Sequence, residues 1–165
     1  MPGYVIHLAV GKVYLRNNKI KNLGEFERGI LAPDMEQDKS KSHYGSYSNK
    51  PDLNRYIELN RELDDFKEGY FLHLLTDYIF YNKFLQGWSA DIYDDYNKLN
   101  RAIVQRYGII VPKEVKDIVQ YADGTPKILS EDRLYQFIET VGKINIRKLF
   151  LSKNIDFDKE FYIDF

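Results

Sequence analysis

The stretch GYFLHLLTDYIF, residues 69–80, constrains the fold of this chain more than any other segment. It is apolar on nearly all sides and reads as the middle of a buried helix, which we place at residues 66–85. His73 and Asp77 are the only acidic or basic side chains in the stretch. Burying such a group without a partner costs several kcal/mol, so the pair needs either a structural or a chemical reason.

Helical patterns dominate the rest of the chain, and period-2 strand patterns are scarce. Pro2 suits a first helical turn, and Pro33 is expected to end the second helix at residue 31. Residues 34–50 are polar and aperiodic, which predicts a loop, and the tail 154–165 reads as a short strand or an extended cover. The remaining helices are predicted at residues 3–16, 22–31, 53–62, 89–107, 112–122 and 130–142. Expected N-caps are Asp52, Asp64 or Asp65, and Ser130.

Composition limits the chemistry available to the chain. Its 165 residues suit one domain, and 44% hydrophobic with 30% charged residues is typical of a globular protein. There is no cysteine, so His, Asp and Glu are the remaining ligand candidates for a metal. A net charge of -1 gives no strong nucleic-acid signal, although Lys12, Arg16, Lys19 and Lys21 form a local basic group. With no transmembrane run and no signal-peptide pattern, we expect a cytoplasmic protein.

The spacing of His73 and Asp77 allows two interpretations. Residues four apart on a helix share a face, so both side chains can point at one metal ion. Zinc accepts imidazole nitrogen and carboxylate oxygen in such sites. A buried His–Asp hydrogen bond that joins helices explains the pair equally simply, and for the pair alone it is the favoured interpretation.

Three further residues bear on this choice. His7 lies in the apolar first helix, His43 lies in the polar loop, and Asp34 follows directly after Pro33. Taken singly, His7 is explained as a core histidine, His43 as an exposed loop residue, and Asp34 as a turn or cap residue. The chain has only three histidines, however, and two of them lie on apolar helices.

The order of these motifs resembles the zinc-dependent phospholipase C family. The motifs are His7, GILAPD ending in Asp34, SHY with His43, and GYFLHLLTD with His73 and Asp77. The resemblance covers residues 1–85 and implies an all-α, single-domain bundle of about six to seven helices, a fold shared with trinuclear-zinc single-strand nucleases. Residues 1–85 would then form the metal-site half, and residues 86–165 a helical cover.

The resemblance also implies a ligand set and an activity. Asp34, His43, His73 and Asp77 would hold one divalent ion, zinc or another metal, and Asp77 would bridge to a second ion held by His7. Asp34 would be the base that activates water. The implied enzyme is a metal-dependent hydrolase of a phosphoester or phosphodiester, with a small phosphoester or phospholipid-like molecule as substrate.

The second half departs from the family pattern. No histidine follows His73, although Tyr135 and Glu139 keep an i, i+4 spacing. We therefore expect one or two ions rather than three. Later acids that could complete the site are Asp91, Asp94, Asp95 and Glu139, although YDDY reads better as a solvated helix face.

Two alternatives and one further pattern stay open at the level of sequence. The chain could be a non-catalytic helical domain whose His/Asp group is a structural or degenerate metal site. A different phosphohydrolase class with an HD dipeptide is disfavoured, because no HD dipeptide occurs. The aromatic residues that could line a pocket, or simply fill the core, are Tyr44, Tyr47, Tyr70, Tyr81 and Trp88.

Overall fold

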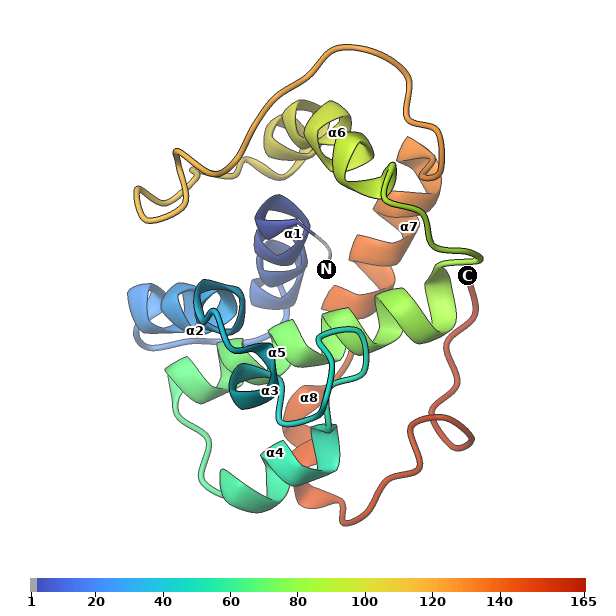
Figure 1. Cartoon of the computed structure of the whole chain (residues 1–165). Coiled ribbons are helices and arrows are strands. Elements are labelled where there is room, and N and C mark those ends of the chain that lie inside the picture. The colour runs from blue at the N-terminus through green and yellow to red at the C-terminus, as the bar shows by residue number, and fades with distance from the viewer. Residues whose placement is uncertain (1–2) are drawn as a thin grey trace.

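The computed structural model describes residues 3–165, and it is helical without strands over that range (Figure 1). This confirms the predicted all-α fold, with one or two more helices than expected. A π-helical segment, η1 (Phe80–Phe84), continues the fifth helix. The eight α-helices of the described residues are α1 (Tyr4–Leu15), α2 (Leu23–Met35), α3 (Lys39–Ser42), α4 (Leu53–Leu59), α5 (Asp65–Ile79), α6 (Ile92–Tyr107), α7 (Glu131–Gly142) and α8 (Ile146–Leu151).

Helices α1 and α5 form the centre of the molecule. Helix α1 contacts α2, α5, α6 and α7, and α5 runs beneath it in the view of Figure 1. Residues 5–10 of α1 and 71–79 of α5 are buried without interruption, as their all-round apolar patterns predict. The buried apolar side chains of both halves of the chain belong to one core. Any polar group within these two stretches is therefore held away from water.

Helices α2 and α5 pack with their backbones in direct contact, through one glycine on each. A Cβ on Gly29 would overlap the carbonyl oxygen of Phe66, and a Cβ on Gly69 would overlap that of Phe26. Only glycine permits this approach, because any side chain would have to displace a helix backbone. The glycine that opens GYFLHLLTDYIF is thus the point at which α2 docks.

The predicted helix starts are confirmed by side-chain caps. Asp52, Asp64 and Ser130 each accept a hydrogen bond from the backbone N–H three residues further on. This leaves fewer unpaired N–H groups at the helix ends. Pro2, expected in the first turn of α1, lies outside the described residues.

The predicted end of the second helix is wrong. Helix α2 continues through Pro33 to Met35, so Asp34 lies in its last turn and does not begin a loop. The Lys39 ammonium group donates to the carbonyl oxygens of Asp34 and Glu36, at 2.7 and 2.6 Å. These contacts satisfy carbonyls that the end of the helix leaves free.

Two other segments differ from prediction because their backbones pair with distant partners. Residues 112–122 form turns instead of a helix: Ala122 N–H donates to the Asn97 carbonyl, and the Asn100 amide donates to that of Gln120. The tail is an extended cover, not a strand, and the Asn54 amide pairs with both backbone groups of Ile155. The loop predicted over 34–50 contains the short helix α3, and α8 was not predicted.

Within residues 3–165, no helix combines the length and apolar character needed to cross a bilayer.

Replacing Gly29 by alanine is expected to lower the free energy of unfolding by about 2 kcal/mol or more, because the added methyl group separates α2 from α5. Urea denaturation followed by circular dichroism measures the change. Gly24→Ala is the matched control on the same helix: Gly24 is exposed, and its Cβ would meet only Asn22 Oδ1, at 3.4 Å. We expect the control substitution to leave the free energy of unfolding unchanged or to raise it by up to about 1 kcal/mol. Equal effects of the two substitutions would contradict the backbone contact.

Candidate metal centre

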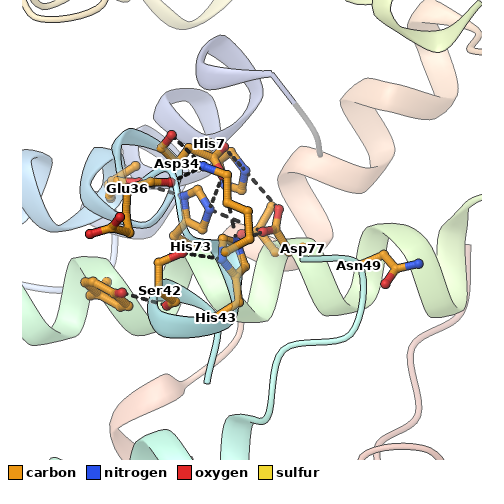
Figure 2. Close-up of polar contacts among 12 residues, drawn as sticks. His7, Asp34, Glu36, Ser42, His43, Asn49, His73 and Asp77 are labelled. Carbon is orange, nitrogen blue, oxygen red and sulfur yellow. Dashed lines mark hydrogen bonds and ion pairs between the residues drawn. The ribbon is translucent and has the colours of Figure 1, made fainter. Parts of the chain in front are cut away.

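Three helices and the residue after α3 bring the predicted side chains together in the interior (Figure 2). Each of these five side chains is at most 2% exposed. We call the group the His/Asp cluster; its members are His7 of α1, Asp34 of α2, His43 after α3, and His73 and Asp77 of α5.

Four of these residues direct one atom each at a common point. His43 Nε2 and His73 Nε2 lie 2.9 and 3.2 Å from Asp77 Oδ2. Measured to Asp34 Oδ1, the same nitrogens lie at 3.8 and 3.4 Å, and the four residues place ligand atoms within 4.8 Å of one another. Ligands at about 2.1 Å in a tetrahedron lie about 3.4 Å apart, so these separations suit a zinc-sized ion. The four residues can hold a metal ion.

The two carboxylates also face His7 with their second oxygens. His7 Nε2 lies 3.1 Å from Asp77 Oδ1 and 3.9 Å from Asp34 Oδ2. Asp34 and Asp77 therefore offer one oxygen to the His43 and His73 side and the other to the His7 side. This is the arrangement of carboxylates that can bridge two neighbouring ions.

Several ligand atoms of the cluster are not aligned with any hydrogen-bond partner. Within residues 3–165, both ring nitrogens of His7, His73 Nε2, Asp34 Oδ1 and Asp77 Oδ1 are buried without a hydrogen bond. Short distances without hydrogen-bond geometry are expected where lone pairs converge on a shared cation. The donor set of imidazole nitrogens and carboxylate oxygens fits zinc and related divalent metals.

The imidazole orientations are set by partners outside the cluster. His73 Nδ1 lies 2.7 Å from the carbonyl oxygen of Ile30, which can only accept, so Nδ1 carries a proton and Nε2 is the nitrogen that can ligate once it is deprotonated. The Ser42 hydroxyl lies 2.7 Å from His43 Nδ1, and Tyr70 donates to the Ser42 carbonyl at 2.6 Å. Both rings thus turn Nε2 toward the carboxylates.

Their surroundings shift the pKa values of His7 and His73 in opposite directions. Burial lowers the pKa of His7, and the neighbouring His73 lowers it further; the two rings stack at 3.7 Å. Burial alone would also lower the pKa of His73, but the charges of Asp34 and Asp77 outweigh it and raise the pKa to about 10. Burial opposes ionisation of Asp77, yet His73 and His7 hold its pKa well below the usual range. The carboxylates are therefore ionised, and a proton on His73 balances part of their charge.

One buried tyrosine that the sequence analysis did not single out is Tyr96 of α6. The Tyr96 hydroxyl has no hydrogen-bond partner among the described residues. Its ring lies 6.3 Å from that of Phe80, three residues after Asp77, and burial raises the pKa of Tyr96, with the charge of Asp77 adding to the effect. Tyr96 belongs to the YDDY motif, whose prediction as a solvated face is wrong for its second half: Asp95 and Tyr96 are buried.

The later acids do not join the cluster. Asp95 accepts hydrogen bonds from the backbone N–H groups of residues 127–129. Glu139 pairs with Arg16 at 2.9 Å, at the far end of α1 from His7. Asp91 and Asp94 pair with lysines. Tyr135 donates to Glu131 and stacks on Arg106. A second ligand group from the C-terminal half is thus not assembled among the described residues.

Comparison of the chain with family models, curated proteins and solved structures gave no match.

We expect metal affinity to rise with pH. A raised pKa of His73, to about 10, means that its proton is bound at neutral pH and must leave before Nε2 ligates. The apparent zinc affinity should then increase by up to about tenfold per pH unit between about pH 6 and pH 8. Competition with a chromophoric chelator measures the affinity, and calorimetry in two buffers counts the released proton. A pH-independent affinity without proton release would contradict this charge assignment.

Removing the hydroxyl that orients His43 should weaken metal binding without unfolding the protein. Ser42→Ala is expected to lower zinc affinity by about tenfold or more, because the imidazole loses the partner of its Nδ1. Ser46→Ala in the same loop is the control, since Ser46 is exposed and outside the cluster. The zinc affinity is again measured by competition with a chromophoric chelator. Equal zinc affinities of Ser42→Ala and Ser46→Ala would show that the Ser42 contact does not orient His43.

Proposed function

We propose that the protein is a metal-dependent hydrolase that cleaves a phosphoester or phosphodiester bond. The observation that carries this proposal is the convergence of three imidazole Nε2 atoms and four carboxylate oxygens in one buried cluster. A divalent cation bound there would supply Lewis acidity and lower the pKa of a coordinated water. Zinc is the proposed metal, with one or two ions per chain, and a small phosphoester or phospholipid-like molecule is the proposed substrate.

Asp34 is the residue to which we assign the base. It is the only member of the His/Asp cluster whose side chain has measurable exposure, 2% against 0% for the others. Its Oδ1 has no hydrogen-bond partner within residues 3–165, and a carboxylate oxygen has two lone pairs, so Asp34 could ligate an ion and also accept a proton from water. His73 and Asp77 are more deeply placed on α5 and would hold position rather than exchange protons.

The order of the five residues along the chain supports the same activity. It is the resemblance to zinc-dependent phospholipase C that suggests a phosphorus ester rather than another hydrolysable bond. The cytoplasmic location stays a prediction from the sequence.

A second candidate is a non-catalytic domain in which the cluster is a structural metal site. The near-complete burial of all five side chains favours it, because a substrate must reach the ions for turnover. The two candidates agree on metal binding and differ only in hydrolysis.

Asp34→Asn separates the candidates. For a hydrolase, we expect turnover of bis(p-nitrophenyl) phosphate by the zinc-loaded protein to fall by about 100-fold or more, because the amide cannot take the proton. The circular dichroism spectrum should stay that of a folded helical protein. Asp123→Asn is the matched control, with a carboxylate that is 96% exposed and remote from the cluster. If the wild-type protein binds zinc but shows no turnover, and Asp34→Asn changes only the melting temperature, the structural candidate is correct.

A further inference from the structure

A pocket of about 370 Å³ lies beside the His/Asp cluster and has no role in the site described so far. Four aromatic side chains line it, together with Lys39 and the polar loop that follows His43. We call it the aromatic pocket; its aromatic members are Tyr47, Tyr81, Trp88 and Tyr93. Three of the residues that the sequence singled out as possible pocket residues are thus brought together by the fold.

The aromatic pocket adjoins the cluster on two elements. Tyr81 follows Asp77 by four residues, about one helical turn along α5 and η1. Lys39 precedes His43 by four residues, and its ammonium group lies 2.7 Å from the carbonyl oxygen of Asp34. Figure 2 shows Asn49, another lining residue, beyond Asp77. A molecule in the pocket would therefore lie next to elements that carry the cluster, although no residue of the cluster itself lines the pocket.

The aromatic side chains of the pocket are unusually open to solvent. Tyr47, Trp88 and Tyr93 are 72%, 60% and 51% exposed. The Tyr81 hydroxyl, in contrast, is buried and has no hydrogen-bond partner among the described residues. Exposed ring faces around an unused hydroxyl suit a ligand with a flat apolar face and a polar edge.

The charges of the residues that line the aromatic pocket indicate which kind of ligand it could bind. Lys39 is the only charged residue among those that line the pocket, and no carboxylate within residues 3–165 does so. A cationic head group would meet the Lys39 ammonium without an acid to balance it. A ligand with an anionic phosphate and a neutral aromatic ring is complementary to this lining. Its phosphate would face the Lys39 ammonium group, and its ring would face the aromatic side chains.

We propose that the aromatic pocket binds the organic part of a phosphoester that carries a planar aromatic ring, with its phosphate toward Lys39 and the His/Asp cluster. The ring stacks on the exposed faces of Trp88 and the pocket tyrosines, and the serine and asparagine side chains of the loop meet its polar edge. This inference rests on the proposed function for the fate of the phosphate, but the binding itself does not require turnover.

Trp88 makes the test direct, because it is the single tryptophan of the chain. Adenosine 5′-monophosphate and phenyl phosphate are the aromatic probes, and phosphocholine and inorganic phosphate are the probes without an aromatic ring. We expect both aromatic probes to quench the Trp88 fluorescence saturably in the 165-residue protein, and the other two to leave it unchanged. A nucleobase requirement would appear as quenching by the nucleotide alone, which also supports the proposal.

Substitution in the pocket distinguishes stacking from non-specific quenching. Tyr47→Ala should raise the Kd for the quenching probe by about fivefold or more, since aromatic stacking is lost. Tyr47 is exposed, so truncation leaves the core intact. Tyr162→Ala, at a tyrosine 92% exposed and outside the pocket, should leave the Kd unchanged.

The outcomes separate this inference from the proposed function. If neither adenosine 5′-monophosphate nor phenyl phosphate quenches the fluorescence, or if phosphocholine quenches it equally, the ligand assignment is overturned. Binding that is unaffected by Tyr47→Ala overturns the location. A protein that binds the aromatic probes through Tyr47 but hydrolyses no phosphodiester overturns the proposed hydrolase and leaves the pocket assignment in place.

Discussion

The backbone contact between α2 and α5, through Gly29 and Gly69, is the constraint on which the rest of the structure depends. One of these helices carries Asp34, and the other carries His73 and Asp77. Both helices lie against α1, which adds His7. Without the close approach, the carboxylate of α2 would stand off from the imidazole of α5, and the cluster would lose one of its bridging groups.

The cluster is an expensive feature for a protein of this size. Two carboxylates and three imidazoles lie together in the protein interior, and buried charges are tolerated only when their partners are complete. A proton on His73 gives part of that compensation, and the Ile30 carbonyl and the Ser42 hydroxyl give more. Apolar residues at the same positions would satisfy the core more simply. Stability of the fold alone therefore does not explain why these five buried residues are polar.

Much of this site was predictable from local sequence, and the reasons are physical. His73 and Asp77 share a face because helical spacing puts them there, and His7 stands out because nothing else in its apolar helix is charged before Lys12. The helix starts at Asp52, Asp64 and Ser130 follow from short-range capping.

Three features were not predicted from the sequence: the burial of Asp95, the continuation of α2 past Pro33, and the burial of Tyr96. Asp95 is buried because backbone N–H groups more than 30 residues downstream bind its carboxylate. Helix α2 continues past Pro33, and the Lys39 ammonium group satisfies the carbonyls of Asp34 and Glu36 at its end. Tyr96 lies on a buried apolar stripe of α6 with Ile92, Leu99 and Ile103, which the four letters YDDY do not show by themselves. The Lys39 contacts are local, whereas those of Asp95 join residues more than 30 apart.

The carbonyl of Ile30 gives the glycine contact a further consequence. Ile30 accepts from His73 and lies one helical turn before Asp34, so the orientation of one ligand and the position of the other depend on the same stretch of backbone. Touching backbones have no side-chain rotamers with which to adjust their spacing. A metal site built on the His/Asp cluster would therefore not widen readily for a larger ion such as calcium, whose oxygen ligands lie at about 2.3–2.6 Å. Discrimination among cations by size would then follow from the contact between the two helices.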